Sequence, residues 1–192
     1  MSNDKLATML AQLKDISEMM IDLAYSSLLY DSEEVAEHVF EMEEIVDNLH
    51  TEFELAVLEL RNVQSNKGIL GLIRLSLAAE DLADAAMMMA DIVKKGVRSH
   101  PVVRMAMEKA EETIMVTEIT EWSDMKDRSL GELGLEDDIG MRIIAVKRVS
   151  GWTYIPSDSF TLKAGDVIIA RGYAEGREKL LTLANPMHTH EY

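Results

Sequence analysis

Four carboxylates at helical spacing are the residues of this sequence whose types and positions could do chemistry. Glu80 and Asp84 lie four positions apart, and Glu43 and Asp47 repeat that spacing earlier in the chain, so each pair shares one face of a helix. Two like charges on one face repel each other unless a cation lies between them. If the two faces meet, their oxygens could surround a hard or borderline metal ion, as carboxylates do in helical bundles. The pattern therefore predicts a divalent or trivalent metal site at these four acids.

The same acids also have an interpretation that involves no metal. Residues 31–59 hold eleven acids and no Lys or Arg, a pattern typical of a solvated helix face. The four carboxylates would then line a solvated groove, or pair with Arg61, Arg74 or a lysine of a partner subunit. The sequence leaves both interpretations open.

The composition excludes several other kinds of chemistry. The 192 residues include no cysteine, so disulfides and thiolate metal sites are excluded. A formal net charge of −16 argues against nucleic acid as a partner, because phosphate binding needs clustered Lys and Arg. The sequence contains no GxSxG, HExxH, P-loop or GxGxxG motif. We therefore expect a protein that is not an enzyme and that does not bind nucleic acid.

The location of the protein is predicted from its hydrophobic runs. The opening residues MSNDKLATML lack a basic segment followed by an apolar one, and Arg74, Glu80 or Asp91 break the apolar runs before they reach membrane-spanning length. We expect a cytoplasmic protein without direct membrane insertion. His188 and His190 belong to a polar terminal segment, which we interpret as a tail rather than a metal site.

The elements that must position the acids are three long helices, predicted at about 3–30, 33–66 and 69–95. In the first two, apolar residues recur at alternating steps of three and four, so each helix has one apolar stripe. The third is apolar or small on nearly every side, which is typical of a helix in the middle of a bundle. The sequence thus predicts an antiparallel three-helix bundle over residues 1–98.

After a short linker helix, expected within 99–112, the period of the sequence changes from helix to strand. Residues 114–123, 141–149, 152–156 and 166–172 read as strands, and Gly165 supplies the backbone freedom of a turn before the last of them. We therefore predict a two-domain α+β protein, with a small α/β domain at 113–192.

The strand region carries a specific pattern. An apolar run leads to Lys147-Arg148, and after a turn come an aromatic residue, Ile155-Pro156, and then Leu-x-x-Gly-Asp and Val-Ile-Ile-x-x-Gly up to Gly172. This pattern resembles the C-terminal regulatory domain of potassium-transport proteins, called TrkA-C or the RCK C-terminal domain, over roughly 113–185. The resemblance implies a non-catalytic, cytoplasmic regulatory homodimer that senses a small ligand or ion. Its partner would be a membrane channel or transporter subunit for potassium or another cation, so it would lie peripheral to a membrane.

The resemblance also implies candidate ligand-binding residues. Some TrkA-C domains bind cyclic di-AMP across their dimer interface, near the start of the strand that begins here at Met141 and near a proline after the hairpin. Arg142 and Pro156 fit that pattern, and Arg148 is a third candidate. Residues 136–138 place three negative charges where a phosphate-binding residue is expected, so we rank a cation, or no ligand, above cyclic di-AMP.

A second resemblance covers residues 3–97. The segment LSLAAEDLADAA is similar to the helix of PhoU-like proteins that carries a Glu-x-x-x-Asp metal motif, and Glu80 and Asp84 match that motif residue for residue. Glu43 and Asp47 match a second copy more loosely. This chain has one three-helix repeat where full PhoU proteins carry two. The resemblance implies an alternative function, that of a PhoU-like metal-binding signalling or scaffold protein in the control of phosphate transport.

Overall fold

The computed structural model describes residues 3–62 and 66–187, and these fall into two compact units that divide between Ser99 and His100. His188, His190 and the side chain of Arg61 lie outside this description. Within the described residues, no helix combines the length and the apolar character that crossing a membrane requires.

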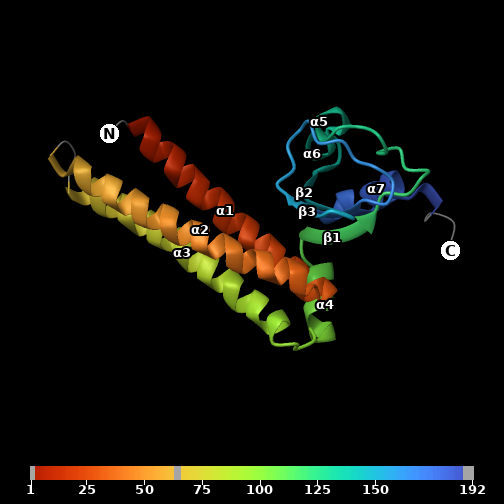
Figure 1. Ribbon diagram of the computed structural model, residues 1–192, viewed down its shortest axis with the longest axis horizontal. Coiled ribbons are helices and arrows are strands. Elements are labelled where there is room, and N and C mark those ends of the chain that lie inside the picture. Colours follow the sequence, from red (N-terminus) through yellow and green to blue (C-terminus); the bar gives the residue numbers. More distant parts are fainter. Residues whose placement is uncertain (1–2, 63–65, 188–192) are drawn as a thin grey trace. The chain divides into compact units, whose positions relative to one another are not determined.

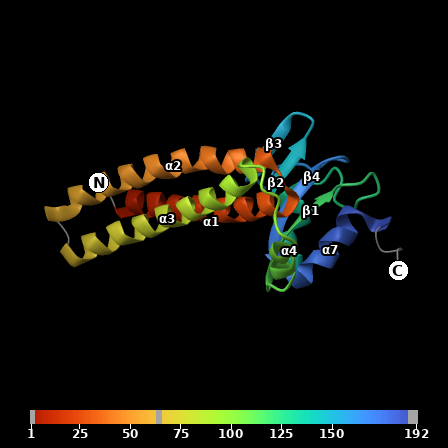
Figure 2. The same ribbon diagram turned by 90° about the horizontal axis from the view of Figure 1, so that it is seen from below.

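The first unit is an antiparallel bundle of three long helices, shown in red, orange and yellow-green in Figures 1 and 2. The connection between the first two helices is set locally, because the Ser32 hydroxyl caps the second helix by accepting a hydrogen bond from the Val35 N–H at 3.3 Å. The elements are α1 (Asn3–Tyr30), α2 (Glu33–Leu58), the short 3₁₀ helix η1 (Glu59–Asn62) and α3 (Asn66–Lys94).

The core of the bundle comes mostly from α1 and α2. Leu13, Met20, Leu23 and Phe53 are among its largest fully buried side chains. The contribution of α3 is a narrow stripe of mostly small side chains, namely Ile69, Ser76, Ala79, Ala83, Ala86, Ala90 and Val93. Small side chains let the three helices approach closely, so the bundle buries little of α3.

The expectation that α3 lies in the middle of a bundle is therefore wrong for this unit. Its large apolar side chains are exposed instead, with Leu75 56%, Leu82 46% and Met88 71% accessible to solvent. Because α3 has only two neighbouring helices in the bundle, they cover one stripe of its surface and leave the rest of its circumference exposed. A pattern that is apolar all round predicts burial, but it does not say which neighbours provide it.

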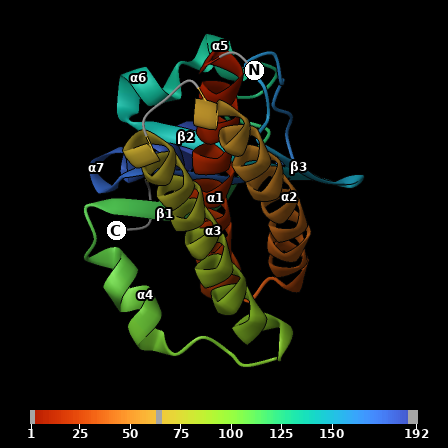
Figure 3. The same ribbon diagram turned by 90° about the vertical axis from the view of Figure 1, so that its left-hand side faces the viewer.

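The second unit is a four-stranded antiparallel sheet with helices, so the predicted α+β class is confirmed. Figure 3 shows α4 leading into β1. The strand order is β1-β4-β2-β3. The elements are α4 (Pro101–Glu108), β1 (Glu112–Glu118), α5 (Leu130–Leu133), α6 (Leu135–Ile139), β2 (Met141–Arg148), β3 (Gly151–Tyr154), β4 (Val167–Tyr173) and α7 (Ala174–Ala184).

One face of this sheet carries the core of the unit. Met115, Met141, Ile143 and Ile168 from the strands pack with Leu180 of α7 and with residues of α5, α6 and the connecting loops. The helix α7 comes very close to the start of β2, since a Cβ placed on Gly176 would lie 2.2 Å from the Ile139 carbonyl oxygen. Only glycine permits this approach, which fixes where β2 begins and so positions the pocket described next.

Candidate functional site

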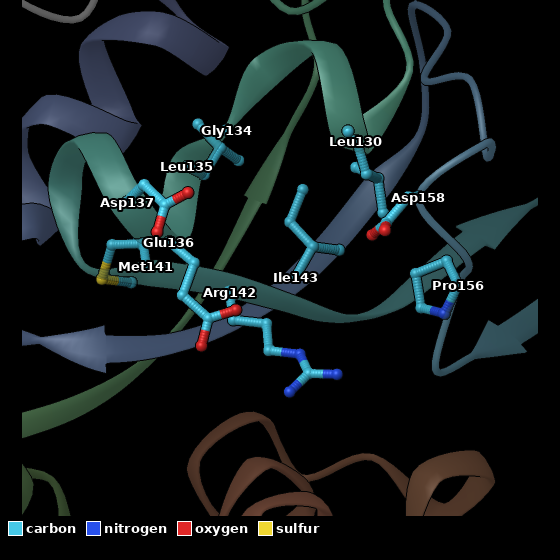
Figure 4. Close-up of a pocket in the computed structure, with 11 residues that line it drawn as sticks. Leu130, Gly134, Leu135, Glu136, Asp137, Met141, Arg142, Ile143, Pro156 and Asp158 are labelled. Atoms are coloured by element: carbon cyan, nitrogen blue, oxygen red, sulfur yellow. The ribbon is translucent and has the colours of Figure 1, made fainter.

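A pocket of about 360 Å³ lies where α5, α6, the start of β2 and the loop after β3 come together. Figure 4 shows the side chains that line it. Three groups contribute: Leu130, Gly131 and Gly134 around α5; Leu135, Glu136 and Asp137 from α6; and Met141, Arg142, Ile143, Pro156 and Asp158 from β2 and the loop. Arg142 and Pro156, the two residues that fit the sequence pattern for a ligand, lie in one pocket.

The α5 wall is held by a capping box. The Ser129 hydroxyl accepts a hydrogen bond from the Glu132 N–H at 3.3 Å, and the Glu132 carboxylate accepts one from the Ser129 N–H at 2.9 Å. The Ser129 N–H, and then the Ser129 hydroxyl, which also donates to this carboxylate at 2.9 Å, lower the pKa of Glu132. Gly131 then donates to the Asp158 carbonyl at 2.8 Å, and a Cβ on Gly131 would lie 3.2 Å from the Asp158 Cβ. The glycine thus lets the loop close against α5.

The opposite wall depends on two unusual backbone conformations. Gly140 ends α6 with φ 67°, which turns the chain directly into β2. Ile155 has φ 48°, which is strained for a β-branched residue, and its N–H donates to the Ile144 carbonyl at 2.9 Å. This conformation turns the chain after β3 and brings Pro156 and Asp158 to the pocket.

The charges that line the pocket are mixed but mainly negative. Glu136 and Asp137 come from α6, Asp158 from the loop, and Arg142 is the single cationic residue in the lining. Three carboxylates beside one arginine repel phosphate groups unless further cations take part. The pocket therefore suits a ligand with positive or neutral groups better than a strongly anionic one.

A smaller pocket of about 190 Å³ adjoins the first and shares Glu136 and Arg142 with it. Its other lining residues include Glu112 and Arg171, and Arg171 lies directly opposite Arg142 in the β2–β4 register. Arg171 was not singled out from the sequence. The signal was present, because Arg171 is the one charged residue of β4 and Arg142 is the one charged residue in the first six residues of β2, and antiparallel pairing can place such residues opposite each other.

Arg148, the third ligand candidate, lies at a different place in the domain. Its guanidinium donates to the carboxylate of Asp166, and to the Thr161 carbonyl at 2.6 Å, and it lies over the Phe160 ring. The side-chain hydrogen bond with Asp166 raises the pKa of Arg148. Arg148 does not line either of the two pockets.

The four acids of the bundle are neighbours across α2 and α3. Partial burial raises the pKa of Glu43, and the charges of Asp47 and Asp84, then of Glu44 and Glu80, raise it further. A carboxylate in this environment is stabilised by a proton or a cation. Carboxylate oxygens are also the ligand type that hard cations prefer. Within the described residues, however, no three Asp, Glu or His side chains converge closely enough to hold one ion.

The chain combines a helical bundle with a small α+β unit that carries a pocket at its strand ends. The comparisons with protein families identify both parts. Residues 10–94 match the PhoU domain, and residues 114–185 match the TrkA-C domain. The chain thus carries a PhoU domain joined to a TrkA-C domain, as both sequence resemblances predicted.

Several solved structures are similar to parts of the chain. The RCK_C domain dimer of S. agalactiae BusR in complex with c-di-AMP is 20% identical, with a TM-score of 0.38, over 42% of this chain and 99% of that one. The RCK C domain of the potassium transport protein KtrA, in complex with the same nucleotide, is 25% identical, with a TM-score of 0.34, over 42% and 92%. The GsuK RCK domain is 13% identical, with a TM-score of 0.35, over 73% and 31%.

No curated protein matches the chain in sequence. S. agalactiae BusR is also known in complex with its promoter DNA, and that structure is 15% identical to this chain, with a TM-score of 0.36, over 96% and 98%. The expectation that this chain has no nucleic-acid partner remains a prediction, based on its net charge.

Proposed function

We propose that this chain is a non-catalytic regulatory protein of potassium or other cation transport. Its TrkA-C domain would bind a small ligand or ion and transmit that signal to a membrane channel or transporter subunit. The observation that carries the proposal is the pocket of about 360 Å³ in this domain, which holds Arg142 and Pro156 together. The protein would act in the cytoplasm as a homodimer, as the family resemblance implies.

The charges in the pocket support a ranking of ligands. Glu136, Asp137 and Asp158 face a ligand from α6 and the loop, and these charges favour a cation over a cyclic dinucleotide. Binding of cyclic di-AMP would require Arg142 from both protomers, with Arg171 beside it, to offset the carboxylates. We therefore place a cation first and cyclic di-AMP second.

Isothermal titration calorimetry of the whole protein tests this ranking, with calcium and with cyclic di-AMP titrated separately. We expect calcium to bind, and we expect an Asp137→Asn/Asp158→Asn variant, which neutralises two carboxylates of the lining, to lose that binding. Lys163→Ala is the control, because Lys163 is exposed and outside both pockets. Submicromolar binding of cyclic di-AMP that Arg142→Ala abolishes would reverse the ranking. Absence of heat with both ligands would contradict a ligand-sensing role for this pocket.

The second candidate function is that of a PhoU-like metal-binding signalling or scaffold protein in phosphate transport control. The specific observation in its favour is the raised pKa of Glu43, which comes from burial and from the neighbouring acids on α2 and α3. Glu43, Asp47, Glu80 and Asp84 would hold the ion, and a divalent or trivalent metal would neutralise their mutual repulsion. Thermal unfolding in the presence of metal ions, described in the Discussion, tests this candidate.

A further inference from the structure

The helix α3 has a second apolar stripe, beside the one that its own bundle buries. Its members follow one another at alternating steps of three and four residues, the spacing of a helix–helix seam. All of them are exposed except Met89, which is partly exposed. We call this the outer stripe; it consists of Gly68, Gly71, Leu75, Ala78, Leu82, Ala85, Met89 and Ile92.

The outer stripe is uncharged along its whole length, although the protein as a whole has a net charge of −16. The apolar surface continues onto α1. A groove of about 520 Å³ between α1 and α3 is lined by Ala7, Leu10 and Ala11 of α1 and by outer-stripe residues such as Leu75. The charged residues in its lining are Lys14 and Glu18, which form an ion pair with each other at 2.8 Å. A partner that docks here need not bury an unpaired charge.

The sizes of the side chains in the outer stripe identify the partner. When the stripe is read from Gly68 to Ile92, each position that holds a large residue holds a small one when the same stripe is read from Ile92 to Gly68. If a second α3 runs antiparallel, with Ala78 opposite the partner's Leu82, then Leu75 lies opposite the partner's Ala85. In the same register Gly71 meets the partner's Met89, and Gly68 meets the partner's Ile92. Each of these pairs sets a large side chain against a small one, which is how facing helices interdigitate.

Other pairings of the same stripe fit less well. In a parallel pair every residue would face its own copy, so leucine would meet leucine and glycine would meet glycine, leaving gaps beside crowded positions. An antiparallel pair shifted by one heptad would leave one end of each stripe uncovered. The complementarity therefore favours a second copy of this chain in one register.

We infer that the outer stripe of α3 is a homodimer interface in which two bundles pair through antiparallel α3 helices. This contact is separate from the TrkA-C pairing that the proposed function implies. The stripe is about 36 Å long at 1.5 Å per residue. If the contact strip is as wide as the spacing of packed helices, about 10 Å, the stripe covers roughly 360 Å² per protomer. A standard stable interface covers about 800 Å² per partner, so this contact alone should be weaker than a permanent dimer.

One charge on the flank of the stripe makes the pairing sensitive to salt. Asp81 is exposed, and in the inferred register it lies within about 3 Å, along the helix axis, of the level of the partner's Asp81. The two carboxylates would repel each other, and salt screens such a repulsion. The interface should therefore strengthen with added salt and with Asp81→Asn, whereas binding to a basic partner would weaken under both changes.

Disulfide crosslinking of the whole protein tests the register, because the chain has no cysteine of its own. Ala78→Cys and Leu82→Cys proteins are mixed in equal amounts and oxidised, and the bridged peptides are identified by mass spectrometry. We expect a mixed dimer about tenfold more abundant than in a mixture of Leu82→Cys with Glu52→Cys, whose site is exposed on α2. Light scattering alone would not serve, since TrkA-C pairing would also give a dimeric mass.

A companion variant separates the interface from the fold. Leu75→Cys protein mixed with Ala85→Cys protein places cysteines at two facing positions of the register and should also crosslink, and adding Leu82→Glu to both proteins should reduce that crosslink about tenfold. Helicity by circular dichroism should stay unchanged, because Leu82 is exposed in the single bundle. A dimeric mass without the 78–82 bridge would overturn the α3 interface while leaving TrkA-C pairing intact. Efficient self-crosslinking of Leu75→Cys alone would overturn it in favour of a parallel pair.

Discussion

Arg148 at the end of β2 donates two hydrogen bonds to the buried carboxylate of Asp166, from Nε to Oδ1 at 2.6 Å and from Nη2 to Oδ2 at 2.8 Å. Asp166 is 2% exposed and also accepts a hydrogen bond from the Lys163 N–H at 2.8 Å. The Gly-Asp of the sequence motif thus joins the turn before β4 to the end of β2. Arg148 is engaged in holding the domain together rather than facing the pocket.

The first prediction follows from this pair. Arg148→Met removes the cationic partner of a buried carboxylate, and we expect the free energy of unfolding to fall by about 2–3 kcal/mol. The loss stays below that of a fully buried pair because the Arg148 side chain is 34% exposed. The control is Arg142→Met on the same strand, which is exposed and should change stability by no more than about 0.5 kcal/mol. Urea unfolding measures both, and equal losses would contradict a special role for the pair.

The second prediction concerns Gly176 in α7. Alanine is normally the better helix former, but its Cβ here would lie 2.2 Å from the Ile139 carbonyl oxygen and 2.7 Å from Cγ of Met141. We expect Gly176→Ala to destabilise the protein by about 1–3 kcal/mol. Because Met141 lines the larger pocket, ligand affinity should fall as well. Glu178→Ala, exposed on the same helix, should stay within about 0.5 kcal/mol of the wild type.

Much of this fold could be predicted because its local patterns agree with its tertiary structure. The strands expected at 141–149, 152–156 and 166–172 correspond to β2, β3 and β4. The expected first strand, 114–123, ends earlier, at Glu118, because the chain leaves the sheet before the loop that leads to α5. The linker helix, expected within 99–112, covers only part of that range, Pro101–Glu108.

The details that sequence reasoning missed depend on contacts between distant segments. Periodicity showed that α3 is apolar all round but not that its bundle covers one narrow stripe. The pairing of Arg142 with Arg171 depends on the register of β2 and β4. The position of Arg148 depends on a carboxylate eighteen residues further along the chain. Residue types alone do not distinguish an arginine that binds a ligand from one that neutralises a buried acid.

The third prediction concerns pH. The pKa of Glu43 is raised in the folded protein, so the folded state holds this proton more tightly than the unfolded state does. The stability that Glu43 contributes is therefore present at low pH and is lost as the pH rises through its raised pKa. Glu43→Gln removes the repulsion, and we expect it to stabilise the protein at pH 7 by about 0.2–0.5 kcal/mol and to flatten the pH profile above the ordinary glutamate pKa.

The matched control for this experiment is Glu52→Gln. Glu52 is an exposed acid of the same helix and is not among the charges that raise the pKa of Glu43. Both variants lose one negative charge, so an effect of net charge alone would be the same in each. If Glu52→Gln stabilised the protein as much as Glu43→Gln, the gain would come from net charge and not from the α2–α3 acids.

The last prediction tests metal binding at Glu43, Asp47, Glu80 and Asp84. An ion that binds the folded state stabilises it by about 2.7 kcal/mol at a hundred times its Kd. For a unit of this size, that gain raises Tm by roughly 10 °C or more. Manganese, iron, zinc and calcium are tested in turn by circular dichroism at the helical signal. We expect at least one to raise the Tm of the wild type and not that of Glu80→Ala/Asp84→Ala.

The control removes the same amount of charge elsewhere on the bundle. Glu52→Ala/Glu59→Ala deletes two exposed acids, so non-specific screening by a divalent cation should change as much in this variant as in Glu80→Ala/Asp84→Ala. A site-specific ion would stabilise the control as strongly as the wild type, because Glu43, Asp47, Glu80 and Asp84 are all intact in it. Equal shifts in all three proteins would show that the ions only screen the net charge of −16, and the acids would then be a solvated helix face.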